Sequence, residues 1–93
     1  MDYLSAGFKL AERLKALPLY RLEREAAGGE VLAKSIFKEI SSIYKTLDFK
    51  KSISYLGPLA IADQLIVGLK ESQKHKNSEA EFNAILQKIN NLI

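Results

Sequence analysis

The sequence predicts an all-α fold, a small antiparallel four-helix bundle whose first helix is kinked or split at Pro18. Apolar residues recur every three or four positions along four segments, as they do on the buried face of a helix. Five glycines and two prolines in 93 residues are too few for the many turns of an all-β sandwich. A chain of this length builds one core, so residues 1–93 are expected to form a single helical domain.

The first segment, residues 4–27, carries a wide apolar row that Pro18 interrupts. Proline lacks the backbone N–H that a helix interior uses, so we expect either a kink or a second short helix that begins at Pro18. Gly28 and Gly29 follow, and glycine readily takes the left-handed conformation found at helix ends. This pair is therefore expected to end the segment.

Residues 30–47 give the clearest helical pattern in the chain. Apolar residues follow one another at steps of four, four, three and four, whereas the alternation typical of a strand fails. The predicted core row is Leu32, Ile36, Ile40, Ile43 and Leu47.

Residues 48–74 are expected to hold two helices separated by a break at Gly57-Pro58. Asp48 suits the N-cap of the short first helix, and proline suits the first position of the second. The apolar side of the first helix is expected to carry Phe49, Ile53 and Leu56. The core row of the second is expected at Leu59, Ala62, Leu65, Ile66 and Leu69, with Ile61, Asp63, Val67 and Gly68 off that row.

A polar loop at residues 72–77 precedes the last helix, whose start is marked by Ser78 and Glu81. Their spacing forms a capping box, in which each side chain accepts a hydrogen bond from the other residue's backbone N–H. The apolar row that follows is Phe82, Ile85, Leu86, Ile89 and Leu92. Four apolar rows joined by short loops cover one another most simply in an antiparallel bundle.

The net charge of +3 is mild, but it is unevenly distributed. Residues 34–76 hold eight lysines against four acidic residues. We expect a solvated basic surface, because lysine is a weak choice for bidentate phosphate recognition. If the two middle helices are antiparallel, its lysines lie at opposite ends of a hairpin, which argues against one nucleic-acid groove. These residues are Lys45, Lys50, Lys51, Lys70, Lys74 and Lys76.

The residues needed for catalysis are scarce. Without cysteine there is no disulfide, thiolate metal site or thiol nucleophile, and no phosphate-binding glycine motif occurs. The single histidine, His75, lies in a polar run, where it is either a solvated loop residue or a proton shuttle or phosphate contact. We expect no enzyme activity, no metal and no cofactor.

Asp63 interrupts the most apolar stretch of the chain. It is either a recognition carboxylate in an interface or a residue that faces water, opposite the core row. Apolar positions off the predicted rows favour a binding function, through a protein partner or self-association. The candidate residues are Asp63, Ile61, Val67, Tyr55, Leu19 and Tyr20. The alternative is an accessory subunit of a nucleic-acid complex or a weak direct binder, with Tyr44 and Tyr55 available for base stacking.

No signal peptide or membrane span is expected. The longest apolar stretch, residues 56–69, is shorter than a bilayer span and contains Asp63 and Gln64. It is better explained as a buried helix, and the expected compartment is the cytoplasm.

In residues 54–93, Leu56-Gly57-Pro58-Leu59 enters an apolar helix, which a polar turn and a terminal amphipathic helix follow. This layout resembles the small immunity proteins that protect lactic bacteria from class IIa, pediocin-like bacteriocins. The resemblance implies a cytoplasmic four-helix bundle, without enzyme activity, that recognises a bacteriocin–receptor complex. The chain departs from that family at Pro18 and at its end, where the family's specificity tail is lacking. No functional residue is therefore carried over.

Overall fold

The computed structural model describes residues 3–25, 28–46, 53–73 and 79–93. Within these ranges the regular structure is helical, as predicted, and the only β feature is an isolated bridge between Glu25 and Val31. The elements are α1 (Tyr3–Ala16), α2 (Leu19–Leu22), α3 (Leu32–Thr46), the 3-10 turn η1 (Pro58–Ala60), α4 (Ile61–Ser72) and α5 (Glu79–Leu92). None of the helices in the described ranges is long and apolar enough to cross a membrane.

Pro18 divides the first segment into two helices. α1 ends two residues before it, and the Pro18 carbonyl accepts the first hydrogen bonds of α2, from the backbone N–H of Arg21 at 3.0 Å and of Leu22 at 3.3 Å. Of the two predicted alternatives, the split is therefore correct. α2 is shorter than expected, because it ends at Leu22. Gly28 and Gly29 do take positive φ angles of 87° and 81°, but in the turn before α3.

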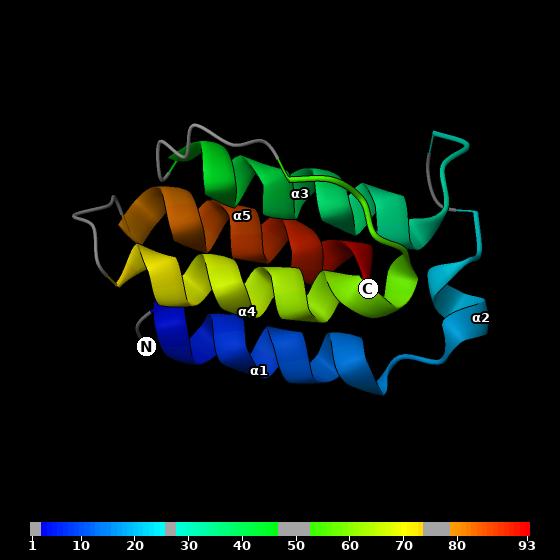
Figure 1. Cartoon of the computed structure of the whole chain (residues 1–93), viewed down its shortest axis with the longest axis horizontal. Helices are drawn as coiled ribbons and strands as arrows, with labels where there is room; N and C mark the ends of the chain where they lie inside the picture. Colours follow the sequence, from blue (N-terminus) through cyan, green and yellow to red (C-terminus); the bar gives the residue numbers. More distant parts are fainter. Residues whose placement is uncertain (1–2, 26–27, 47–52, 74–78) are drawn as a thin grey trace.

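The directions of α3 and α4 differ from the expected hairpin. The Tyr44 hydroxyl, near the end of α3, donates to the Gln64 carbonyl of α4 at 2.7 Å, and a Cβ built on Gly68 would lie 3.2 Å from the Tyr44 ring. Both helices run away from the α2 end of the molecule, so they are parallel (Figure 1). The condition considered above, that these two helices are antiparallel, is therefore not met, because the chain returns along residues 53–60 before α4 begins.

α1 lies parallel to α5 and antiparallel to α4. Tyr3 stacks on Phe82 near the beginning of α5, with ring centroids 4.8 Å apart, and Arg13 hydrogen-bonds to Asn90 near its end. The same Tyr3 reaches the last residue of α4, Ser72. Among the long helices, α1 and α5 thus run in one direction and α3 and α4 in the other (Figure 1).

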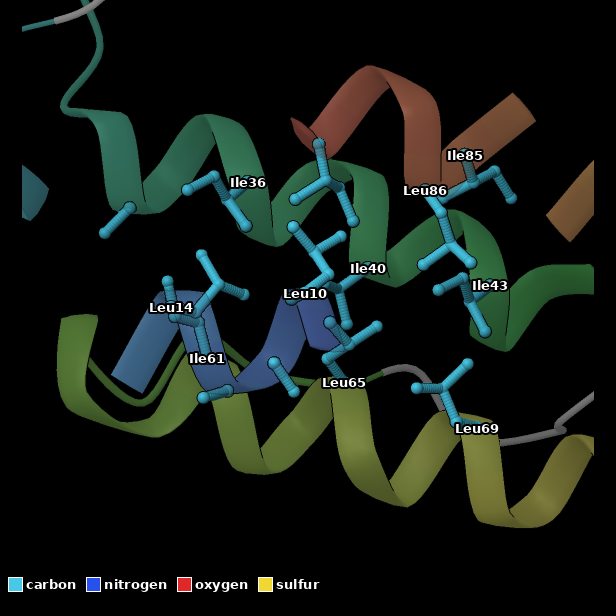
Figure 2. Close-up of a cluster of buried hydrophobic side chains, with 14 of the residues drawn as sticks. Leu10, Leu14, Ile36, Ile40, Ile43, Ile61, Leu65, Leu69, Ile85 and Leu86 are labelled. Carbon is cyan, nitrogen blue, oxygen red and sulfur yellow. The ribbon is translucent and has the colours of Figure 1, made fainter. Parts of the chain in front are cut away.

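The core lies between the four long helices, since α1 and α3 each pack on both α4 and α5. Leu10, Ile40 and Leu65 meet at its centre, and Leu14, Ile36 and Ile61 lie toward one end (Figure 2). The side chains without any exposed surface are Ala33, Ile36, Ile40, Ile43, Leu65, Leu69, Phe82 and Ile89. Apart from Leu47, which lies outside the described residues, and Leu92, which is only partly buried, the predicted rows of α3 and α5 therefore face inward.

The buried face of α4 is rotated from the predicted one. Leu59 is 77% exposed, whereas Ile61 is 1% exposed, so the expected positions of these two residues are wrong. Gly68 is buried too. The reason is that Leu59 belongs to the 3-10 turn, whose three residues per turn do not continue the phase of the α-helix.

Two other predictions are only partly covered. Residues 53–57 are not helical, whereas Asp48 and Phe49 lie outside the described residues. α5 begins at Glu79 as predicted, although Ser78, the expected cap, also lies outside them.

Candidate functional site

α2 and η1 contact each other at one end of the molecule (Figure 1). Large exposed apolar side chains belong to α2, to η1 and to the residue before Gly57. We call this surface the exposed apolar end. Its four members are Leu19 at 43% exposure, Tyr20 at 68%, Leu56 at 72% and Leu59 at 77%. Four of the five exposed large apolar side chains in the described ranges belong to it, and Val67, on α4, is the fifth.

The local sequence explains why these side chains point outward. α2 has only one turn, so it buries a single residue, Leu22. Gly57 precedes η1 with a φ of 102°, which glycine takes without the strain that a Cβ brings. Pro58 then starts the 3-10 turn and leaves Leu59 on its outer side.

The charges next to the exposed apolar end are balanced. The residues around the end of α2 are Arg21, Glu23, Arg24 and Glu25, and all four are exposed. This end therefore offers apolar contact area with no excess of either charge.

Asp63 faces water, as one of the two predicted alternatives requires. Its side chain is 73% exposed, and its Oδ1 lies 3.6 Å from Lys15 Nζ, which is 56% exposed. An ion pair this exposed contributes at most about 1 kcal/mol to stability. Val67 is exposed one turn further along α4.

The side chains of the two tyrosines considered for base stacking both pack against other residues of the protein. Tyr44 is buried, and burial, followed by the charge of Glu71, raises the pKa of its hydroxyl, while a backbone hydrogen bond at Gly68 lowers it. Base stacking on Tyr44 is therefore ruled out.

Tyr55 is half-buried at the rim of the core. Its ring meets Phe37 edge-on at 5.4 Å, and Lys34 Nζ lies 5.9 Å from the ring centroid. Burial, followed by the charge of Glu23, raises the pKa of the Tyr55 hydroxyl.

Two of the six candidate basic residues lie in described parts of the chain. Lys45 and Lys70 are both exposed, and each stands in the last turn of its helix. Because α3 and α4 are parallel, these lysines lie at the same end of the molecule, so the sequence-based argument against a shared basic surface fails. The others, Lys50, Lys51, Lys74 and Lys76, lie outside the described residues, as does His75.

A groove separates α1 from α5 on the outside of the molecule, with a volume of about 490 Å³. It is lined by Ala6, Lys9, Leu10, Arg13, Asn83, Leu86, Gln87 and Asn90. This groove was not predicted, because nothing in the sequence indicated that α1 and α5 would be neighbours. The exposure of Leu56 and Leu59 was not predicted either, since both were placed on the apolar sides of helices, although the Gly57-Pro58 break between them was visible.

Comparison of the chain with known protein families, curated proteins and solved structures found no match. The assignment of a function therefore depends on the surfaces described above.

Proposed function

We propose that this chain is a binding protein without enzyme activity that docks a protein partner through its exposed apolar end. The observation that supports this proposal is the grouping of Leu19, Tyr20, Leu56 and Leu59 on α2 and the segment around η1. Exposed apolar residues scattered singly need no explanation, but a contiguous patch is typical of an interaction site.

The surface also favours a particular kind of partner. Tyrosine and leucine bury a large apolar area, and the balanced charges around α2 add no strong preference for an acidic or a basic protein. We infer a partner that offers an apolar face of its own, such as the apolar side of an amphipathic helix or a second copy of this chain.

The architecture proposed for this module is a four-helix bundle of α1, α3, α4 and α5, with α2 and η1 at one end. The core side chains shared by these helices support it. The resemblance to bacteriocin immunity proteins implies a narrower form of the same function. In that form the module works in the cytoplasm and the partner is a bacteriocin–receptor complex.

Affinity capture from the native host, with matched variants, tests the proposal. Leu59→Lys places a charge in the middle of the exposed apolar end, and Val67→Lys makes the same change elsewhere on the surface. We expect Leu59→Lys to abolish recovery of the partner and Val67→Lys to retain it. Sedimentation of the purified chain shows whether that partner is a second copy. A monomer that recovers the same proteins with and without Leu59→Lys would contradict the proposal.

The second candidate is nucleic-acid binding by the basic end, and it is supported by the positions of Lys45 and Lys70. Direct binding through phosphate contacts weakens steeply as salt rises. Retention on DNA or RNA at low salt, lost in a Lys45→Gln, Lys70→Gln double variant, would support this candidate. Passage of the unaltered chain through both resins at low salt would dismiss direct binding.

A further inference from the structure

The groove between α1 and α5 has one side made of cations and the other of amides. Lys9 and Arg13 stand one turn apart on α1 and line one wall. Asn83, Gln87 and Asn90 follow one row of α5 and line the opposite wall. Because α1 and α5 are parallel, the two rows lie alongside each other over their whole length.

The charge of this groove is positive. Its lining includes two cationic side chains and no acidic residue. Arg13 uses one of its five N–H groups in the hydrogen bond to Asn90, and Lys9 has no partner among the described residues. Donors therefore remain for an anionic group near the Arg13–Asn90 end of the groove.

The amide row is unusual for a water-facing helix. Asparagine is a poorer helix former than lysine, glutamate or alanine, so two asparagines in one row lower the intrinsic stability of α5. Amide side chains both donate and accept hydrogen bonds, which suits recognition of a polar group whose orientation matters.

The floor of the groove is apolar and short. Leu10 and Leu86 form it at its centre, and Ala6 extends it toward the beginning of α1. The lining positions run over eight residues on each helix. The seven steps between the first and the last correspond to about 10 Å at 1.5 Å per step. That length fits a small molecule, whereas a docked helix would need contacts well beyond it.

We propose that this groove binds a small organic anion, with its carboxylate or phosphate between Lys9 and Arg13 and a short apolar body over Leu10 and Leu86. The site is separate from the exposed apolar end, because the two share no residue. The two can therefore succeed or fail independently.

Titration of the labelled protein by NMR tests this site with three probes of equal chain length. Octanoate and octyl phosphate carry the two anionic groups, and octanol carries neither. We expect both anions to shift the side-chain amide signals of Asn83, Gln87 and Asn90. The anion that binds with the higher affinity identifies the preferred anionic group. Octanol is expected to leave these signals in place.

Matched variants assign the binding to the cations. Arg13→Gln and Lys9→Gln each replace the cation by an uncharged polar side chain. Each is expected to lower the affinity for the anion by about tenfold, as loss of a charged hydrogen bond does. Lys88→Gln removes an exposed charge of α5 outside the groove and is expected to change nothing. Thermal unfolding of each variant confirms that the fold is retained.

Four results would overturn the proposal. The amide signals could stay in place with both anions, octanol could shift them as octanoate does, or Arg13→Gln could bind as the unaltered chain does. Shifts confined to Tyr20 and Leu59 would place the probes on the exposed apolar end and would likewise overturn it.

Discussion

The Tyr3 hydroxyl lies 3.0 Å from Ser72 Oγ and joins the first turn of α1 to the last turn of α4. Ser72 is 1% exposed, and its single hydroxyl proton is donated to the Leu69 carbonyl at 2.5 Å. The proton between the two side chains therefore comes from Tyr3. This buried pair fixes the antiparallel arrangement of the two helices.

Ser72→Ala is expected to lower the free energy of unfolding by about 1–3 kcal/mol, because the buried Tyr3 hydroxyl loses its acceptor. Tyr3→Phe is expected to cost less, about 1 kcal/mol, since the stacking on Phe82 remains. Urea titration measures both. Tyr20→Phe, at an exposed tyrosine, is the control and should leave the midpoint unchanged. Equal midpoints for all three variants would show that the hydrogen bond contributes nothing.

Gly7 sets the close approach of α1 and α4. A Cβ at this position would lie 2.6 Å from Leu69 Cδ1, and Leu69 is fully buried. Gly7→Ala gains about 1 kcal/mol of helix propensity, but the overpacking costs about 1–3 kcal/mol. We expect a net loss of stability in thermal unfolding.

Adding Leu69→Val to Gly7→Ala is expected to recover part of that loss, because the shorter side chain vacates the space. A more stable Gly7→Ala protein would mean that α1 and α4 lie further apart than described.

Two neighbouring residues of opposite exposure test the rotation of α4. Ile61→Ala is expected to cost about 2–5 kcal/mol, as truncation of a fully buried side chain does. Leu59→Ala is expected to stay within about 0.5 kcal/mol of the unaltered chain, since its side chain is in water. Chemical denaturation of the pair measures both. A larger loss of stability for Leu59→Ala than for Ile61→Ala would support the core row predicted from the sequence instead.

Stability is expected to fall at alkaline pH through Tyr44. Burial is the main reason that the pKa of this hydroxyl is raised above its ordinary value of 10.0. The unfolded chain therefore loses this proton first as the pH rises above that value, and the folded state binds more protons than the unfolded one. The stabilising contribution is complete below pH 10.0 and declines as the pH rises toward the folded pKa.

Urea midpoints measured across this pH range are expected to fall less steeply in Tyr44→Phe than in the unaltered chain. Tyr20→Phe supplies the comparison, because it removes an exposed tyrosine. Parallel curves for Tyr44→Phe and the unaltered chain would contradict the assignment to Tyr44.

The helical periods predicted α3 and α5 well, since each is a regular helix with one buried row. They failed at Leu59 because the row was extended through a proline-initiated 3-10 turn as though it were α-helix. Gly68 and Ser72 could have corrected the phase. They continue the row from Ile61 and Leu65 at steps of three and four, but neither counts as apolar in a pattern of large side chains.

The apolar pattern did not predict the direction in which each helix runs. An amphipathic row states which side of a helix is buried and says nothing about its neighbour. Those directions place Lys45 and Lys70 at the same end of the molecule. They also bring Lys9 and Asn83 to the two sides of one groove. Pro18, by contrast, was identified from its restricted backbone, and it does separate α1 from α2. Pro58 begins η1, but the helix expected before it is not present at residues 53–57.

A photo-crosslinking residue placed at Leu59 gives the most direct test of the exposed apolar end as a docking surface. Irradiation in the native host is expected to give one defined adduct, which Tyr20→Lys should suppress and which the same crosslinker at Lys88 should not form. No adduct from Leu59, or the same adducts from both positions, would contradict the account.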